Sequence, residues 1–115
     1  MAINVGISDF VDDPTSLTAE FARAVEAFGF NALGIRDHQS DGRDPFIRLA
    51  IAALNTSKLT VYPAVSNPLT RHWSVLASLC NTLQELAPRR FKLILGGGDI
   101  AAKEMGRKGA SLGEM

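Results

Sequence analysis

The sequence predicts an α/β fold in which parallel βα units form the first half, four strands, of a TIM (β/α)8 barrel. Short apolar or β-branched runs begin near residues 3, 31, 59 and 91. Strand and helix therefore repeat at about 30 residues, the length of one βα unit with its crossover. Polar residues follow every run, as at the mouth of a barrel, where successive strand ends contribute to one site.

The glycines argue against a dinucleotide-binding fold, which needs them in the first strand-to-helix turn. Here residues 8–13 form that turn without a glycine, and the glycines follow the fourth apolar run instead. A complete barrel has about 250 residues, whereas this chain has 115. We therefore expect one domain over residues 1–115, the N-terminal half of a barrel with no second domain, as a fragment or truncated product.

The first unit has clear helix-boundary signals. Residues 3–8 are expected to form the first strand. Asp13 is placed as the N-cap of the helix that follows, with Pro14 at its first position. Gly29 is placed to end that helix in the left-handed conformation. Its apolar face, at helical spacing, consists of Leu17, Phe21, Ala24, Val25 and Phe28.

The remaining units follow the same plan. Residues 32–36 are the second expected strand, and Asp44 with Pro45 repeats the cap-then-proline signal. Residues 58–65 and 91–95 are the third and fourth expected strands. The second helix is marked by Ile47, Ala50, Ile51 and Leu54, and the third by Leu76, Leu79, Cys80, Leu83 and Leu86.

Composition excludes several classes of protein. Twelve basic and twelve acidic residues cancel, so no charge excess favours nucleic acid or an anionic membrane surface. No apolar run approaches the roughly 18 residues of a membrane span, and the N-terminus does not have the pattern of a signal peptide. Cys80 is the one cysteine, and no zinc-type spacing occurs. We expect a cytoplasmic protein without a metal site.

Polar groups at the ends of the expected strands are the candidate site. Asp37 and His38 follow the second strand, where a carboxylate and an imidazole could orient a polar ring or move a proton near neutral pH. The alternative is an Asp that caps a loop beside an exposed His. Pro68 restricts Asn67 to extended conformations, so the turn after the third strand must be tight.

Two further segments have a functional and a structural interpretation. Gly96, Gly97, Gly98 and Asp99 could let backbone amides approach a flat or phosphorylated ligand, or could form a flexible turn. Arg71 and the following histidine could face an anion near the start of the third helix. The alternative for that pair is a solvated helix start.

The stretch from residue 66 to residue 72, Ser-Asn-Pro-Leu-Thr-Arg-His, resembles the luciferase-like monooxygenase superfamily. The resemblance extends through the following helix to Arg90-Phe91 and to the glycine segment at 96–99. Within the superfamily, the chain is most similar to the branch that uses the deazaflavin coenzyme F-420, to which the methylenetetrahydromethanopterin reductases belong. The resemblance covers essentially the whole chain.

The resemblance implies a (β/α)8 barrel that binds a flavin or deazaflavin at the carboxyl ends of its strands. It implies a bulge with a non-proline cis peptide bond, by position Ala64-Val65, behind the cofactor ring. It places Asp37 and His38 beside the ring as catalytic residues, and Asp9 on the substrate side. The cofactor-binding residues that it implies are Ala64, Val65, Ser66, Asn67, Gly96, Gly97, Gly98 and Asp99.

The expected function is hydride transfer between F-420 and a small organic substrate. One alternative is an FMN-dependent monooxygenase, and another is an inactive half-barrel fragment or interaction subunit. We expect a homo-oligomer, because a half-barrel leaves two strand edges unpaired.

Overall fold

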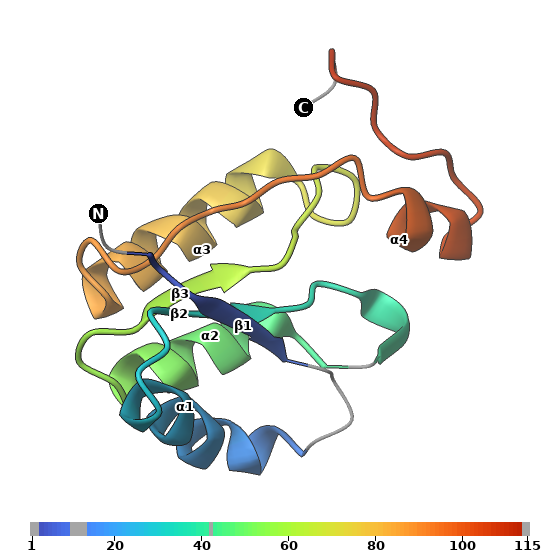
Figure 1. The fold of residues 1–115 in the computed structure, drawn as a ribbon. Coiled ribbons are helices and arrows are strands. Elements are labelled where there is room, and N and C mark those ends of the chain that lie inside the picture. The colour runs from blue at the N-terminus through green and yellow to red at the C-terminus, as the bar shows by residue number, and fades with distance from the viewer. Residues whose placement is uncertain (1–2, 10–13, 42, 114–115) are drawn as a thin grey trace.

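The computed structural model describes residues 3–9, 14–41 and 43–113, apart from the side chains of Asp9 and Asp41. Within these ranges, three strands form a parallel sheet in the order β1-β2-β3 (Figure 1). The strands are β1 (Gly6–Asp9), β2 (Ala32–Ile35) and β3 (Thr60–Pro63). The α-helices are α1 (Thr18–Ala27), α2 (Pro45–Leu54), α3 (Trp73–Leu86) and α4 (Asp99–Glu104), and the 3₁₀ helices are η1 (Thr15–Leu17) and η2 (Gln39–Asp41).

The fourth predicted strand is the main correction to the fold. Residues 91–95, all of which the structure describes, make two isolated parallel bridges: Phe91 with Val61 of β3, and Leu95 with Ser66 in the segment that follows β3. Between these bridges the chain advances five residues on the β3 side but four on the other. One extra residue on one side of a pair is the pattern of a bulge, which interrupts the ladder. The observed sheet therefore has three strands and a bridged segment instead of four strands.

The core lies between the sheet and its helices. Leu33, Ile35 and Val61 alternate with residues of the opposite sheet face and are almost completely buried. Helix α2 packs against β3, α1 and α3, so it is the central helix of the layer; Figure 1 shows α1 and α2 side by side. The buried residues that the helices contribute are Ala22, Val25, Phe46, Leu49, Ala52, Ala53, Leu76 and Leu83.

The apolar pattern overestimated the buried face of two helices. Phe28 of the first expected face is 84% exposed, and Ile47 and Leu54 of the second are 61% and 66% exposed. On α2 the buried stripe instead carries Ala52 and Ala53. Phe46 and Leu49 lie on the same buried stripe, so the apolar side chains of α2 that face the core are not the ones at Ile47 and Leu54.

The opposite face of the sheet is shaped by a close contact between Gly34 and Tyr62. A Cβ added at Gly34 would lie 2.8 Å from Cε2 of Tyr62 and 2.8 Å from Cβ of Ala64. Glycine is therefore required at this position for the aromatic ring to lie across β2.

Two of the predicted helix boundaries are confirmed. Asp44 caps α2, with Oδ1 accepting hydrogen bonds from Phe46 N at 2.8 Å and Ile47 N at 3.2 Å. Gly29 follows α1 with φ +88°, in the left-handed region. The predicted cap Asp13 lies outside the described residues.

Two charged side chains connect the amino ends of the strands. Glu26, near the end of α1, accepts hydrogen bonds from the backbone amides of the turn before β3: Lys58 N at 2.8 Å, Leu59 N at 2.9 Å and Ser57 N at 3.1 Å. Arg90 donates to the carbonyl oxygens of Ala53 and Leu59, both at 3.0 Å. In the described parts of the chain, no helix is long and apolar enough to cross a membrane.

Candidate functional site

A cleft of about 540 Å³ lies at the carboxyl ends of the strands. It is bounded by the segments that follow β2 and β3, by the glycine segment, and by the start of α4. The lining residues are Arg36, Asp37, His38, Ala64, Val65, Asn67, Gly96, Gly97, Gly98, Asp99, Ile100 and Ala101. The structure thus brings together most of the residues that the sequence singled out. Ser66 is buried beneath the cleft, and for Asp9 only the backbone is described, paired with Ile35.

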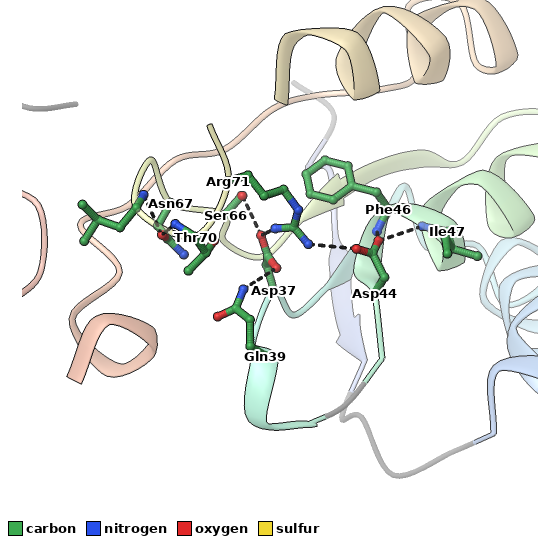
Figure 2. A network of polar contacts seen from close by, with 10 residues as sticks. Asp37, Gln39, Asp44, Phe46, Ile47, Ser66, Asn67, Thr70 and Arg71 are labelled. Carbon is green, nitrogen blue, oxygen red and sulfur yellow. Dashed lines mark hydrogen bonds and ion pairs between the residues drawn. The ribbon is translucent and has the colours of Figure 1, made fainter. Parts of the chain in front are cut away.

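Asp37 lines the cleft and is the centre of a polar network (Figure 2). Its side chain is 1% exposed. Oδ2 accepts hydrogen bonds from Ser66 Oγ at 2.6 Å and from Arg71 Nη1 at 2.5 Å. The Asp37 carboxylate therefore joins the end of β2 to the turn that follows β3.

Arg71 is held on three sides. Besides Asp37, its Nη2 donates to Asp44 Oδ2 at 3.0 Å, and its guanidinium lies 4.7 Å from the centroid of the Phe46 ring. Partial burial acts to lower the pKa of Arg71, but the hydrogen bonds and charges of Asp37 and Asp44 outweigh it and raise the pKa. The guanidinium is thus a fixed cation between two carboxylates.

The sequence allows two predictions for Arg71: that it faces an anion, or that it lies in a solvated helix start. The structure gives it a third role, as the partner of two carboxylates of this chain. Asp37 and Arg71 are 34 residues apart. No local spacing in the sequence could have indicated this contact, because it depends on how the second and third units pack.

His38 lies at the edge of the cleft, with a side chain that is 15% exposed. Its Nδ1 lies 2.7 Å from Ser40 Oγ, and its Nε2 lies 3.7 Å from Glu104 Oε1 on α4. The imidazole is thus held between η2 and α4. A proton on Nε2 would face a carboxylate.

The segment 64–67 forms the floor of the cleft, and the peptide bond between Ala64 and Val65 is cis, as the resemblance implies. Val65 is 45% exposed and lines the cleft. Asn67 Oδ1 accepts hydrogen bonds from Leu69 N and Thr70 N, both at 3.0 Å. The amide oxygen of Asn67 therefore stabilises the tight turn that the sequence predicted.

The glycine segment packs closely on this floor. A Cβ at Gly96 would lie 2.8 Å from Val65 Cγ2, and a Cβ at Gly98 would lie 2.6 Å from Asn67 Cβ. Gly98 also has φ +69°. Glycine is thus required at position 98 by its φ and by the contact with Asn67, and the lack of side chains at 96–98 leaves backbone open along the cleft.

Comparison with known proteins identifies the family. A family model described as luciferase-like monooxygenase matches residues 7–114. The chain belongs to the luciferase-like monooxygenase family.

Within this family, the chain is similar to 5,10-methylenetetrahydromethanopterin reductases. It is 34% identical over 96 residues to the enzyme of Methanolobus tindarius, which covers 84% of this chain and 29% of the relative. It is 32% identical over 99 residues to that of Methanopyrus kandleri, covering 86% of this chain and 28% of the relative. The chain therefore spans less than a third of the length of these relatives.

Solved structures agree with this placement. The coenzyme F420-dependent tetrahydromethanopterin reductase of Methanopyrus kandleri has a TM-score of 0.83 at 31% identity, covering 92% of this chain and 30% of that one. The oxygenating constituent of 3,6-diketocamphane monooxygenase from Pseudomonas putida, in complex with FMN, has a TM-score of 0.78 at 20% identity, covering 94% and 34%. The second likeness shows a shared fold.

The luciferase-like cleft in this chain combines a floor of small and apolar residues with polar edges. The floor consists of Ala64, Val65 and glycine backbone, whereas His38 and Asp99 contribute titratable groups. Such a surface suits a planar ring with polar edges. Asp37 does not offer its Oδ2 to a ligand, because Ser66 and Arg71 occupy that oxygen.

Proposed function

We propose that the cleft binds the ring of the deazaflavin coenzyme F-420, and that the protein transfers hydride between this coenzyme and a small organic substrate. The observation that carries the proposal is that the segments after β2 and β3 and the glycine segment at 96–99 meet around one cleft, with Val65 exposed in its floor. Its support from relatives is the similarity to an enzyme described as coenzyme F420-dependent.

The cleft fits a planar ring in size and chemistry. Its volume of about 540 Å³ lies within the roughly 300–1,000 Å³ of typical ligand pockets. The glycines at 96–98 carry no side chain that would fill it. The apolar surface of Val65 can contact one face of a ring, while His38 and Asp99 can meet its polar edge.

The chemistry divides between coenzyme and protein. A bound deazaflavin supplies the hydride acceptor or donor. The residues of this chain would orient the ring, and Val65, which is exposed in the floor, would contact it there. His38 can hold or release a proton at Nε2, next to Glu104. The Arg71–Asp37 pair keeps the floor in place through Ser66.

An FMN-dependent monooxygenase is the second candidate function. The observation that favours it is the likeness of this fold to the monooxygenase constituent that was solved with FMN. The floor and the glycine segment suit either tricyclic ring, so the two cofactors must be compared directly.

The test is a titration of the purified chain with F-420 and, separately, with FMN, followed by absorbance and fluorescence. We expect the F-420 spectrum to change on binding, and the change to be lost in Val65→Arg, whose long side chain would enter the cleft. The matched control is Val75→Arg on α3, because Val75 is 51% exposed and lies outside the cleft. This control should bind F-420 as the parent does.

Each other outcome overturns the proposal. Binding of FMN without binding of F-420 would favour the monooxygenase function. No binding of either cofactor, or equal loss in both valine variants, would contradict a ring-binding cleft.

A further inference from the structure

Ser66 connects three segments at the cleft. It is 0% exposed, and its hydroxyl donates to Asp37 after β2. Its backbone amide donates to Ile94 O at 3.0 Å, and its carbonyl accepts from Gly96 N at 2.8 Å. The position of Ser66 therefore sets how the floor of the cleft lies against the glycine segment.

Arg71 connects Asp37, which accepts the hydrogen bond from Ser66, to the start of α2. Asp44 caps α2 through Oδ1 and binds Arg71 through Oδ2, so one carboxylate joins the guanidinium to the start of a helix. The Phe46 ring beneath the guanidinium is 2% exposed. Figure 2 shows Arg71 between Asp37 and Asp44. A buried carboxylate held in this way is fixed in orientation.

We propose that Arg71 is a positioning residue for the cleft: it holds Asp37, and through Asp37 it holds Ser66 and the floor on which the ligand lies. Arg71 is absent from the lining of the cleft itself, so it acts through other residues. Where the effect is measured by cofactor binding, the inference rests on the proposed function. A second measurement, independent of any cofactor, keeps the two separable.

Arg90 is the matched control for Arg71. It is also partly buried, and it also binds oxygen atoms of residues more than thirty positions away, Ala53 and Leu59. These partners lie at the amino end of the sheet, away from the cleft. If Arg71 were only a structural residue, replacing either arginine would have the same kind of effect.

The first measurement is backbone amide exchange in Arg71→Gln and Arg90→Gln, without any cofactor. The amides of Ser66 and Gly96 report directly on the floor, since both are hydrogen-bonded across it. We expect their exchange to become about tenfold faster in Arg71→Gln, in the manner of a local opening. In Arg90→Gln, the exchange rates of these two amides should equal those of the parent once the change in global unfolding free energy of the variant is taken into account.

The second measurement is the affinity for F-420. Arg71→Gln should weaken binding by about tenfold, a size usual for coupled polar networks. Ser66→Ala should weaken it as well, and the double variant should bind about as Arg71→Gln does, because both changes break the same connection. Arg90→Gln should retain the parent affinity in its folded fraction.

Arg71→Lys keeps the test open if the glutamine variant does not fold. Lysine preserves the positive charge beside Asp37 but lacks the planar fork that reaches two carboxylates. In Arg71→Lys, we expect the amides of Ser66 and Gly96 to exchange at rates between those of the parent and of Arg71→Gln. The affinity for F-420 should also be intermediate.

Three results would overturn the proposal: parent-like exchange in Arg71→Lys, equal effects of Arg71→Gln and Arg90→Gln at Ser66 and Gly96, or additive losses of affinity in the double variant. If the parent chain binds no F-420, the proposed function fails, while the exchange experiment still decides the role of Arg71.

Discussion

The two ends of the parallel sheet each contain a carboxylate that joins neighbouring βα units, but they do so with different partners. At the amino end, Glu26 accepts hydrogen bonds from three backbone amides before β3. At the carboxyl end, Asp37 binds the side chains of Ser66 and Arg71, and the cleft lies above it. The Glu26 contacts hold the turn before β3, whereas the Asp37 contacts hold the turn that borders the cleft. We therefore propose that the amino end stabilises the fold and that the carboxyl end binds ligand, the arrangement found in barrel enzymes.

The largest expected effect comes from Asp37→Ala. It leaves the partly buried Arg71 with Asp44 as its remaining carboxylate and removes the acceptor of Ser66. Breaking a buried ion pair by removing one partner typically costs about 3–5 kcal/mol, and we expect the lower part of that range. Urea denaturation measures the loss in unfolding free energy. A loss below about 1 kcal/mol would contradict a buried, paired carboxylate.

Glu26→Gln should lower the unfolding free energy by about 1–2 kcal/mol, because hydrogen bonds to a charged group contribute more than those to a neutral one. The control is Glu85→Gln on α3, whose side chain is exposed and should change stability by less than about 0.5 kcal/mol. Affinity for F-420 in the folded state should be unchanged by Glu26→Gln. A loss of affinity equal to that of the cleft variants would remove the distinction between the two ends.

The pH dependence of stability sharpens the same comparison. Partial burial raises the pKa of Glu26, but the amide hydrogen bonds from Lys58, Ser57 and Leu59 outweigh it, so the pKa is lowered in the folded state. The contribution of Glu26 is therefore complete above the unfolded pKa of about 4.3 and is lost as the pH falls through the lower folded value.

Denaturation of the parent and of Glu26→Gln, measured in parallel between about pH 7 and pH 2, checks this sign. The two unfolding free energies should converge toward acid pH. A difference that grew on acidification would show that the carboxylate is stabilised in its protonated form.

Gly96→Ala should have the smallest effect on stability. The new Cβ would lie 2.8 Å from Val65 Cγ2, the end of a half-exposed side chain that can rotate. We expect a cost of about 1 kcal/mol or less, with Val65 displaced into the cleft and F-420 bound more weakly. A stability loss above about 3 kcal/mol would show instead that the glycine segment is part of the core.

The sequence predicted features that depend on neighbouring residues. Asp44 caps α2 and Gly29 ends α1, since both signals act within one turn. The cis bond at Ala64-Val65 came from the family resemblance. Most of the polar residues that follow the expected strands line one cleft, because parallel strands place their carboxyl ends on one side of the sheet.

Features that depend on packing between units could not be predicted. The pairing of Arg71 with Asp37 joins residues from different units. The shifted register between the bridges at Phe91 and Leu95 interrupts an apolar run that otherwise has the composition of a strand. The exposure of Ile47 depends on which stripe of α2 allows the closest approach, and hydrophobicity alone does not determine this.

The central claim is that the carboxyl end of the sheet binds the ring of F-420 while the amino end stabilises the fold. Titration of ¹⁵N-labelled protein with F-420, followed by amide chemical shifts, tests it most directly. We expect shifts at Val65, Ser66 and residues 96–98, with the amides of Lys58 and Leu59 at the Glu26 turn unmoved. Shifts centred on the Glu26 turn, or no shifts around the cleft, would contradict it.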